Sequence, residues 1–306
     1  MTVVKTITPP THIRLFLHLV GMIFLILNKV RHALRGYGRP RPFSADDIEQ
    51  AISYDFSVVA SWQKHLTEYT AGKTTVKDHT VLELGPGADL GVGLMLLAQG
   101  AKKYYALDAN YLIGATPPSF YDALYEKIKT QFPTASLSIL PEQLSLTMRG
   151  SPDRLNYTVD KYFNLEVVPA QEIDLVCSQA AFEHFSDVKK TIEQLSAIVK
   201  PGTILVAEID LQTHSRWIRD HDPLNIYRYS NWFYRLCQFS GSPNRVRPYE
   251  YAAWLEQNGW GHIEVKPLVA LANEYTKKIT PRLAGRFQDS KNQMEVLSCM
   301  LLATKK

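Results

Sequence analysis

Cysteines are few in this sequence, and they are widely spaced. Cys177, Cys237 and Cys299 are the three cysteines of the 306-residue chain, and no two of them form a CxxC pair. This number and spacing exclude a disulfide framework and a structural zinc site of the CxxC type. We expect each cysteine to be a small buried apolar residue in a reducing compartment.

Long lysine or arginine tracts, RNA-binding aromatic signatures and zinc-finger spacings are also missing. The formal net charge is only +4, from 34 basic and 30 acidic residues. A balance this small would suit an anionic substrate or a membrane surface, but it is too weak to indicate nucleic-acid binding. We therefore expect no nucleic-acid partner. Repeats and low-complexity tracts are absent, and a hydrophobic content of 45% is ordinary for a globular protein.

The one long apolar run lies near the N-terminus. Residues 15–27 are apolar except for His18 and Gly21, and basic residues flank the run on both sides. Crossing a hydrocarbon core takes ~20 apolar residues, so the run predicts an interfacial helix. The basic residues that follow it argue against a signal peptide. Two interpretations remain: a monotopic anchor in which residues 14–35 meet the membrane surface, or a helix docked on protein. The run is apolar nearly all round, which favours the membrane.

The remainder of the chain predicts one α/β domain. A turn-rich linker follows the apolar run, and the next segment predicts a helix with Ser44 as N-cap and Asp47 in the capping-box position. Strand-like runs then alternate with helical stretches, which is the pattern of a mostly parallel sheet. The predicted strands are residues 80–85, 103–108, 174–179 and 203–211. The predicted division is an arm and linker at 1–43 and a domain at 44–306, with an inserted lid at 211–260.

The first predicted strand leads into a glycine turn that begins with an acid. The turn reads Glu83-Leu84-Gly85-Pro86-Gly87, and a helix is expected to begin near Asp89. Glycines let the backbone turn sharply and let a ligand approach closely. The second strand ends in Asp108, about 20 residues later, where a carboxylate can take both hydroxyls of a ribose.

Two kinds of cofactor compete for such a turn. A dinucleotide would place its pyrophosphate beside Glu83 and Asp89, and Pro86 removes a backbone N–H that a phosphate would use. The third glycine of the dinucleotide fingerprint is also missing. S-adenosylmethionine carries a sulfonium and an α-ammonium group and no phosphate, so Glu83 would stabilise it. The turn favours the sulfonium cofactor, and an NAD(P)-dependent oxidoreductase is the disfavoured alternative.

Four segments resemble the successive motifs of class I S-adenosylmethionine-dependent methyltransferases: "VLELGPGADLG", "YYALDAN", "DLVCSQAAFEHF" and "IVKPGTILVAEIDL". The resemblance covers residues 78–304 and is specific for the cofactor rather than the substrate. It implies an α/β fold with a seven-stranded, mostly parallel Rossmann-like sheet, helices on both faces and an antiparallel last strand. Residues 294–306 are the candidate for that strand. The implied activity is methyl transfer from S-adenosyl-L-methionine.

The resemblance also implies where the cofactor binds. It places the methionine end at the glycine turn, the ribose at the end of the second strand, and the boundary between cofactor and acceptor at the end of the fourth. The residues that match these places are Glu83, Gly85, Gly87, Asp108, Ala109, Asn110, Ser178 and Gln179.

The long aromatic connection at 211–260 is the candidate for substrate binding, because connections of this length are usually functional. We interpret it as an acceptor lid in which His214 or His221 is the general base and Tyr229 contacts the substrate. Arg245 and Arg247 would grip an anionic group. The plainer alternative is that its aromatics pack the lid and its arginines coat its surface.

His184, in the segment "AFEHF", is a third candidate for the base. It lies either near the transferring methyl or at a helix start with structural hydrogen bonds. A base is required only for an unactivated acceptor such as a hydroxyl. His214, His221 and Asp222 do not form a convincing set of metal ligands, so we predict no metal.

These observations favour an enzyme over a binding protein. The first hypothesis is a methyltransferase for a small-molecule, lipid or glycan acceptor, located in the cytoplasm and peripheral or monotopic at the membrane. The alternative is a non-catalytic protein that keeps the cofactor fold for partner docking. The intact set of Glu83, Gly85, Gly87 and Asp108 argues against that alternative.

Overall fold

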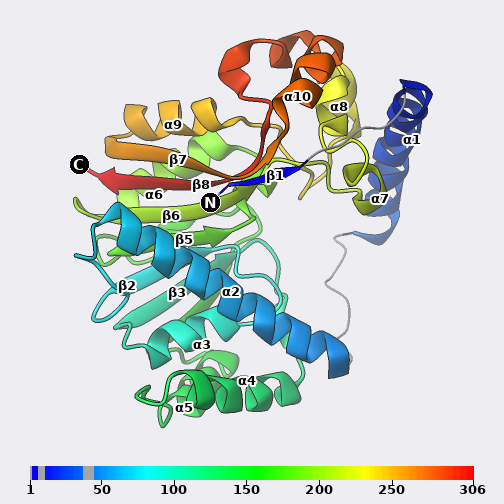
Figure 1. Ribbon diagram of the computed structural model, residues 1–306. Coiled ribbons are helices and arrows are strands. Elements are labelled where there is room, and N and C mark those ends of the chain that lie inside the picture. Colours follow the sequence, from blue (N-terminus) through cyan, green and yellow to red (C-terminus); the bar gives the residue numbers. More distant parts are fainter. Residues whose placement is uncertain (1, 6–10, 37–44) are drawn as a thin grey trace.

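An eight-stranded sheet forms the centre of the computed structural model, which describes residues 2–5, 11–36 and 45–306 (Figure 1). The strand order is β1-β7-β8-β6-β5-β2-β3-β4, and β8 is antiparallel to both of its neighbours while the other pairs are parallel. The strands are β1 Val3–Lys5, β2 Thr80–Leu84, β3 Lys103–Asp108, β4 Leu155–Val159, β5 Leu175–Gln179, β6 Ile204–Asp210, β7 Trp260–Leu271 and β8 Val296–Lys305.

The predicted mostly parallel sheet with an antiparallel last strand is confirmed for β2 to β8. The four strands predicted by residue range agree with β2, β3, β5 and β6 to within one residue at each end. The described chain adds an eighth strand, because β1 pairs in parallel with β7 at the sheet edge. Its three residues are exposed and too few to give a periodic pattern, so the sequence did not predict it.

Helices cover both faces of the sheet. On one face α2 crosses over α3 and α4 and contributes a stripe of buried apolar side chains spaced as on one side of a helix, among them Ile52, Val59, Trp62 and Leu66. On the other face α6 and α9 pack together. The helices are α1 Thr11–Arg35, α2 Ala45–Tyr69, α3 Gly91–Ala98, α4 Pro118–Gln131, α5 Leu140–Met148, α6 Val188–Ile198, α7 Arg216–Arg219, α8 Asn231–Cys237, α9 Pro248–Gln257 and α10 Asn273–Ile279.

The direction of the chain through the sheet reverses between β2 and β5. From β2 the chain moves outward through β3 to β4, and from β5 it moves outward through β6 in the opposite direction. Ligands of open α/β sheets bind outside the carboxyl ends of the strands at such a switch point. The glycine turn after β2 and the ends of β3, β5 and β6 therefore meet at one edge.

The N-terminal helix α1 stands at the margin of the molecule beside α7 and α8 (Figure 1). It is longer than the apolar run from which it was predicted. The three cysteines are free and buried, as predicted. The predicted N-cap Ser44 and residues 37–42 of the predicted linker lie outside the described residues.

Candidate functional site

The two glycines of the turn after β2 have backbone conformations that favour glycine. Gly85 has φ 76° and Gly87 has φ 85°. A Cβ at position 85 would lie 2.6 Å from the Cβ of Ala181, so that position has no room for a side chain. A Cβ at position 87 would meet no atom within 4 Å. The turn at residues 85–89, which we call the glycine loop, therefore packs tightly on one side and leaves open space on the other.

Asp108 ends β3 and points toward the glycine loop. Its carboxylate accepts hydrogen bonds from the backbone N–H of Asn110 at 3.0 Å and of Gly87 at 3.4 Å. Burial raises the pKa of this carboxyl, and the amides of Asn110, Gly87 and Ala109 oppose that rise. The residues predicted at the glycine turn and at the end of the second strand are thus brought together.

Glu83 is buried beneath the glycine loop, where it is 2% exposed. Its carboxylate accepts a hydrogen bond from the hydroxyl of Tyr104. Burial raises the pKa of Glu83 to about 8; the Tyr104 hydrogen bond opposes this rise, and the charges of Asp89 and Asp108 add to it. The carboxyl is therefore mostly protonated at neutral pH, and a cation bound at the loop would favour its charged form.

Glu83 should make the free protein less stable as pH rises. A carboxyl whose pKa is raised on folding keeps a proton that the unfolded chain has lost, so its contribution declines between about pH 4.5 and 8. We expect Glu83→Gln, which cannot ionise, to reduce that decline by on the order of 3–5 kcal/mol. Urea unfolding of both proteins from pH 5 to about 8 measures it. Equal pH slopes would contradict the burial of an ionisable Glu83.

Helix α2 adds two residues to this site that sequence reasoning missed. Asp55 lies against the start of α3: a Cβ at Gly91 would be 2.0 Å from its Oδ2. Burial and then the charge of Asp89 raise the pKa of Asp55 well above its usual range. The Tyr54 hydroxyl interacts with Gln179, and partial burial raises its pKa to about 12. The sequence predicted the helix but not which of its turns would meet the sheet edge.

Two of the three predicted histidines meet at the ends of β5 and β6. His184 ends a short 3-10 helix, Phe182–His184, and His214 follows β6; their Nε2 atoms are 3.1 Å apart. The Nδ1 of His184 lies 2.6 Å from the Gly241 carbonyl oxygen, and the Nδ1 of His214 lies 3.0 Å from the Gln212 carbonyl oxygen. A carbonyl only accepts, so in the neutral rings each Nδ1 carries the hydrogen and each Nε2 carries a lone pair.

Burial shifts the ionisation of this histidine pair and of the acid beside it. Desolvation, followed by the charge of His214, lowers the pKa of His184 to about 4, and desolvation also lowers the pKa of His214. Glu183 is 2% exposed, and burial raises its pKa well above the usual range. Neither oxygen of its carboxylate has a hydrogen-bond partner among the described residues. Burial therefore favours the neutral form of both imidazoles, whose Nε2 lone pairs can act as hydrogen-bond acceptors or ligands.

A cavity of about 380 Å³ opens over the histidine pair. Its polar end is formed by the pair, Thr213 and Ser215, and α1 and the lid form the rest of its wall. The lining includes Phe24, Leu25 and Asn28 of α1 and Trp217, Ile218, Ile226, Tyr234, Cys237, Gln238, Phe239, Gly241, Ser242 and Pro243 of the lid. The cavity is thus mostly apolar with two imidazoles at one end. Another hollow, of about 440 Å³, lies at the sheet edge beside β1 and β7 and does not include these groups.

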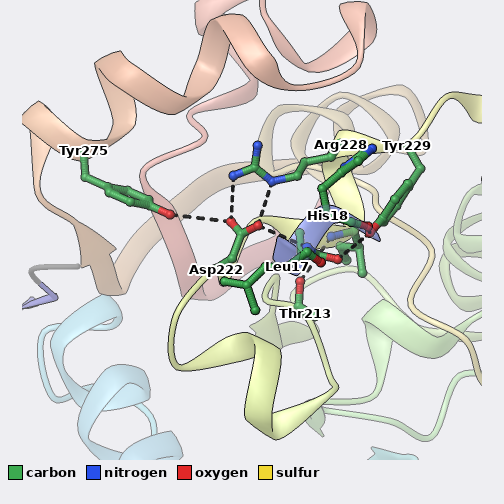
Figure 2. Close-up of polar contacts among 9 residues, drawn as sticks. Leu17, His18, Thr213, Asp222, Arg228, Tyr229 and Tyr275 are labelled. Carbon is green, nitrogen blue, oxygen red and sulfur yellow. Dashed lines mark hydrogen bonds and ion pairs between the residues drawn. The ribbon is translucent and has the colours of Figure 1, made fainter. Parts of the chain in front are cut away.

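A buried ionic network organises the part of the lid that faces α1 (Figure 2). Asp222 is fully buried, and its carboxylate accepts from the Arg228 guanidinium at 2.6 and 3.1 Å. The Asn225 amide, at 3.1 Å, and the Tyr275 hydroxyl, at 3.5 Å, also donate to it. Because Asp222 accepts hydrogen bonds from three other side chains, its role is to hold these parts of the chain together.

The same network reaches α1 through two side chains. The Asn225 amide donates to the carbonyl oxygen of Leu17 at 3.1 Å, and the Tyr229 hydroxyl donates to that of His18 at 2.8 Å. Gly21 allows this approach, because a Cβ there would lie 2.1 Å from the Asn225 Oδ1 and 2.3 Å from the Tyr229 hydroxyl oxygen. One stripe of α1 is therefore docked on the lid.

A wide face of α1 away from the lid is exposed and apolar. Residues Leu15–Leu34 have a mean hydropathy of 1.4, are long and apolar enough to cross a membrane, and have only 11% of their number buried. This helix lies near the N-terminus, where signal sequences have a similar composition. Its low burial distinguishes it from the core helix of a soluble protein. The exposed apolar residues of this face include Leu15, Phe16, Leu19, Ile23, Ile26, Leu27, Val30 and Leu34.

Three of the predicted substrate and base residues have other roles in the structure, and a fourth lies outside the cavity. Tyr229 is buried and bonded to α1, and His221 is exposed and does not line the cavity. Arg245 and Arg247 are buried, and their N–H groups are taken up inside the protein, so the prediction that they grip an anion is wrong. The acceptors are Ile226, Tyr229 and Asn231 for Arg245, and Asn292, Gln293, Val296 and Tyr227 for Arg247.

Ser178 was also assigned to the wrong environment. It is fully buried, and its hydroxyl donates to the Leu84 carbonyl oxygen at 2.8 Å, which joins β5 to β2. Its neighbour Gln179 is half-buried at the end of β5 and interacts with Tyr54. Successive side chains of a strand point to opposite faces of the sheet, so Ser178 and Gln179 have different surroundings. Of the two, only Gln179 is partly exposed.

The comparisons with known proteins agree on one activity. A family model for a methyltransferase domain matches residues 57–271. The mitochondrial ubiquinone biosynthesis O-methyltransferase of Dictyostelium discoideum is 31% identical over 131 residues, which cover 40% of this chain and 34% of that protein. The chain thus spans about a third of the length of the curated relative it matches.

Two solved structures are among those to which the chain is similar. A putative S-adenosylmethionine-dependent methyltransferase from Listeria monocytogenes is 15% identical with a TM-score of 0.45, covering 82% of this chain and 99% of that one. Phosphoethanolamine N-methyltransferase 2 of Haemonchus contortus, in complex with S-adenosyl-L-methionine, is 13% identical with a TM-score of 0.43, covering 83% and 52%.

Proposed function

The chain belongs to the methyltransferase-domain family and is a class I S-adenosylmethionine-dependent methyltransferase, and we propose that its acceptor is a membrane-held amphiphile methylated on oxygen. The observation that carries this proposal is the cavity whose apolar wall includes the exposed helix α1 and whose polar end is the histidine pair. The family assignment favours this activity over the oxidoreductase and the non-catalytic protein.

The residues at the switch point fit S-adenosylmethionine. Open space at Gly87 leaves room for a ligand, and the buried carboxyl of Glu83 is one that a cation would ionise. Asp108 lies beside the loop, where its remaining acceptor capacity suits ribose hydroxyls. The bound cofactor supplies a methyl group on a positively charged sulfur. The protein's task is then to hold that methyl and the acceptor in line and to keep water out.

The chemistry of the cavity supports an amphiphilic acceptor. Carbohydrate acceptors need many polar partners, whereas most of this wall is aliphatic or aromatic. An apolar tail would pack against Phe24 and Leu25 of α1, and the polar head would reach the histidine pair. The curated relative is named as an O-methyltransferase, which agrees with an oxygen acceptor. A position at the cytoplasmic face of the membrane, through α1, completes the proposal.

Methyl-labelled cofactor tests the acceptor class. We expect the full-length protein, incubated with labelled S-adenosylmethionine and a membrane extract of its source organism, to place most of the label in the lipid fraction. Mild alkali, which cleaves esters, should leave this label in place. Heat-inactivated protein is the background control. Label found mainly in the polar or polymer fraction would reject the amphiphile.

A second experiment tests whether the exposed apolar face of α1 contacts a membrane. We expect Leu19→Gln/Ile23→Gln/Leu27→Gln to reduce sedimentation with anionic lipid vesicles at least about fivefold, because these side chains are exposed and do not line the cavity. Met148→Gln/Val167→Gln, at exposed sites on other elements, is the matched control. Substitution is preferable to removal of residues 1–35, which would also delete β1. Unchanged sedimentation of the α1 variant would reject the membrane contact.

A further inference from the structure

Three potential metal-ligating groups meet at the polar end of the cavity. They are the carboxylate of Glu183 and the imidazoles of His184 and His214, with one ligand atom from each within 4.8 Å of the others. Two come from the 3-10 helix after β5 and one from the loop after β6, so the adjacent parallel strands bring them together. His214 lies 30 residues from His184 in the sequence, so the sequence alone did not show this set. The prediction that no metal binds considered His214, His221 and Asp222 instead.

The two imidazoles are oriented as metal ligands are. Each Nδ1 is held by a backbone carbonyl oxygen, that of Gly241 or that of Gln212, which is the usual way in which a protein fixes a ligating histidine. The free Nε2 atoms are 3.1 Å apart. Two nitrogens each about 2.0–2.1 Å from one ion subtend an angle of about 100° at that separation, between octahedral and tetrahedral geometry.

The arrangement is unfavourable when nothing lies between these groups. Two neutral imidazoles in these tautomers direct lone pairs at each other. Both carboxyl oxygens of Glu183 are buried and have no hydrogen-bond partner among the described residues. Burying polar oxygens without a hydrogen-bond partner is unfavourable. A cation bound by all three groups would remove both costs. A proton shared by the histidine pair would remove only the first.

We propose that Glu183, His184 and His214 bind one divalent transition-metal ion whose open coordination positions face the acceptor cavity. Two nitrogen donors and one carboxylate suit zinc, cobalt, iron or manganese better than magnesium or calcium. Three protein ligands leave positions for water or an acceptor oxygen. The acceptor's role rests on the proposed function, but the binding of the ion does not.

The ion would activate an acceptor hydroxyl. Coordination of the hydroxyl oxygen lowers its pKa, and its proton passes to solvent. The oxygen lone pair then forms a bond to the cofactor's methyl carbon while the carbon–sulfur bond breaks, and that electron pair stays on sulfur. The products are a methyl ether, a neutral thioether and one released proton.

Cobalt(II) is the probe for this site, because its visible absorption reports the ligand geometry. The untagged full chain is treated with a chelator, dialysed and titrated with Co²⁺. We expect one ion per chain, with binding weakened at least about 100-fold in Glu183→Gln and in His214→Ala. His221→Ala, an exposed histidine of the same lid that does not line the cavity, is the matched control and should bind as the wild type does.

X-ray absorption of the zinc-loaded wild type is a second measurement that needs no variant. We expect two imidazole nitrogens and oxygen in the coordination shell, without sulfur. Absence of saturable Co²⁺ or Zn²⁺ binding, or an equal affinity in both variants that still bind S-adenosylmethionine, would overturn the proposal. Neither readout uses a methyl acceptor. A metal-free enzyme that labels lipid at full rate would refute the ion's role and leave the proposed function intact.

Discussion

Replacing Glu83 with glutamine is expected to weaken S-adenosylmethionine binding by about 2–4 kcal/mol, since a buried carboxylate beside a cationic ligand is lost. Glutamine has nearly the same shape and can still accept a hydrogen bond from Tyr104. The fold around the glycine loop should therefore survive, and the loss reports charge rather than packing. Isothermal titration of both proteins at pH 7.5 gives the difference.

The same variant should abolish a pH dependence that the wild type shows. Cation binding favours the charged form of Glu83, whose pKa is about 8 in the free protein, so the complex holds fewer protons than its parts. By linkage, wild-type affinity rises by up to about tenfold per pH unit between about pH 5.5 and 7.5. Titrations in buffers of different ionisation enthalpy measure the released proton. Glu193→Gln, at an exposed position of α6, is the control. A wild type that releases no proton would show that Glu83 does not meet the cofactor's charge.

Sequence reasoning about the glycine turn predicted the positions of the two acids but not the ionisation of Glu83. The order of strand, acid, glycines and second acid predicted that Glu83 precedes the glycine turn and that Asp108 ends the next strand, as in the structure. Local chemistry and strand alternation determine those positions. The sequence treated Glu83 as permanently charged, whereas the structure buries it under the loop and raises its pKa. Burial of an acid depends on which helices cover the sheet edge, and α2 contributes Tyr54 and Asp55 from outside the motifs.

The lid was less predictable for a related reason. Arg245 and Arg247 have the composition of an anion clamp, but carbonyl oxygens from distant parts of the chain take up their N–H groups. Only the three-dimensional path shows which carbonyls lack other donors. His184 and His214 are 30 residues apart and meet because β5 and β6 are adjacent. His221 is closer in sequence to His214, but it is exposed and outside the cavity.

Gly21→Val is expected to separate α1 from the lid and to lower methylation of an amphiphilic acceptor at least about tenfold, with cofactor affinity changed less than about twofold. The added side chain would overlap Asn225 and Tyr229, whose atoms lie 2.1 and 2.3 Å from the position of a Cβ. Relief of that overlap breaks the hydrogen bonds to the Leu17 and His18 carbonyl oxygens. The α1 wall of the cavity would then be lost. Hydrogen exchange of residues 15–30 should increase, since the helix loses its tertiary support.

Ala33→Val is the matched control for this substitution, because it places the same side chain on an exposed position of the same helix. It should leave exchange, cofactor binding and methylation near wild-type values. If Gly21→Val releases α1 while amphiphile methylation stays at the wild-type rate, α1 is only an anchor and the acceptor enters elsewhere. If instead cofactor binding falls with methylation, the lid and the glycine loop are one cooperative unit. Comparing the loss of methylation with the loss of cofactor affinity therefore decides whether α1 is part of the acceptor site.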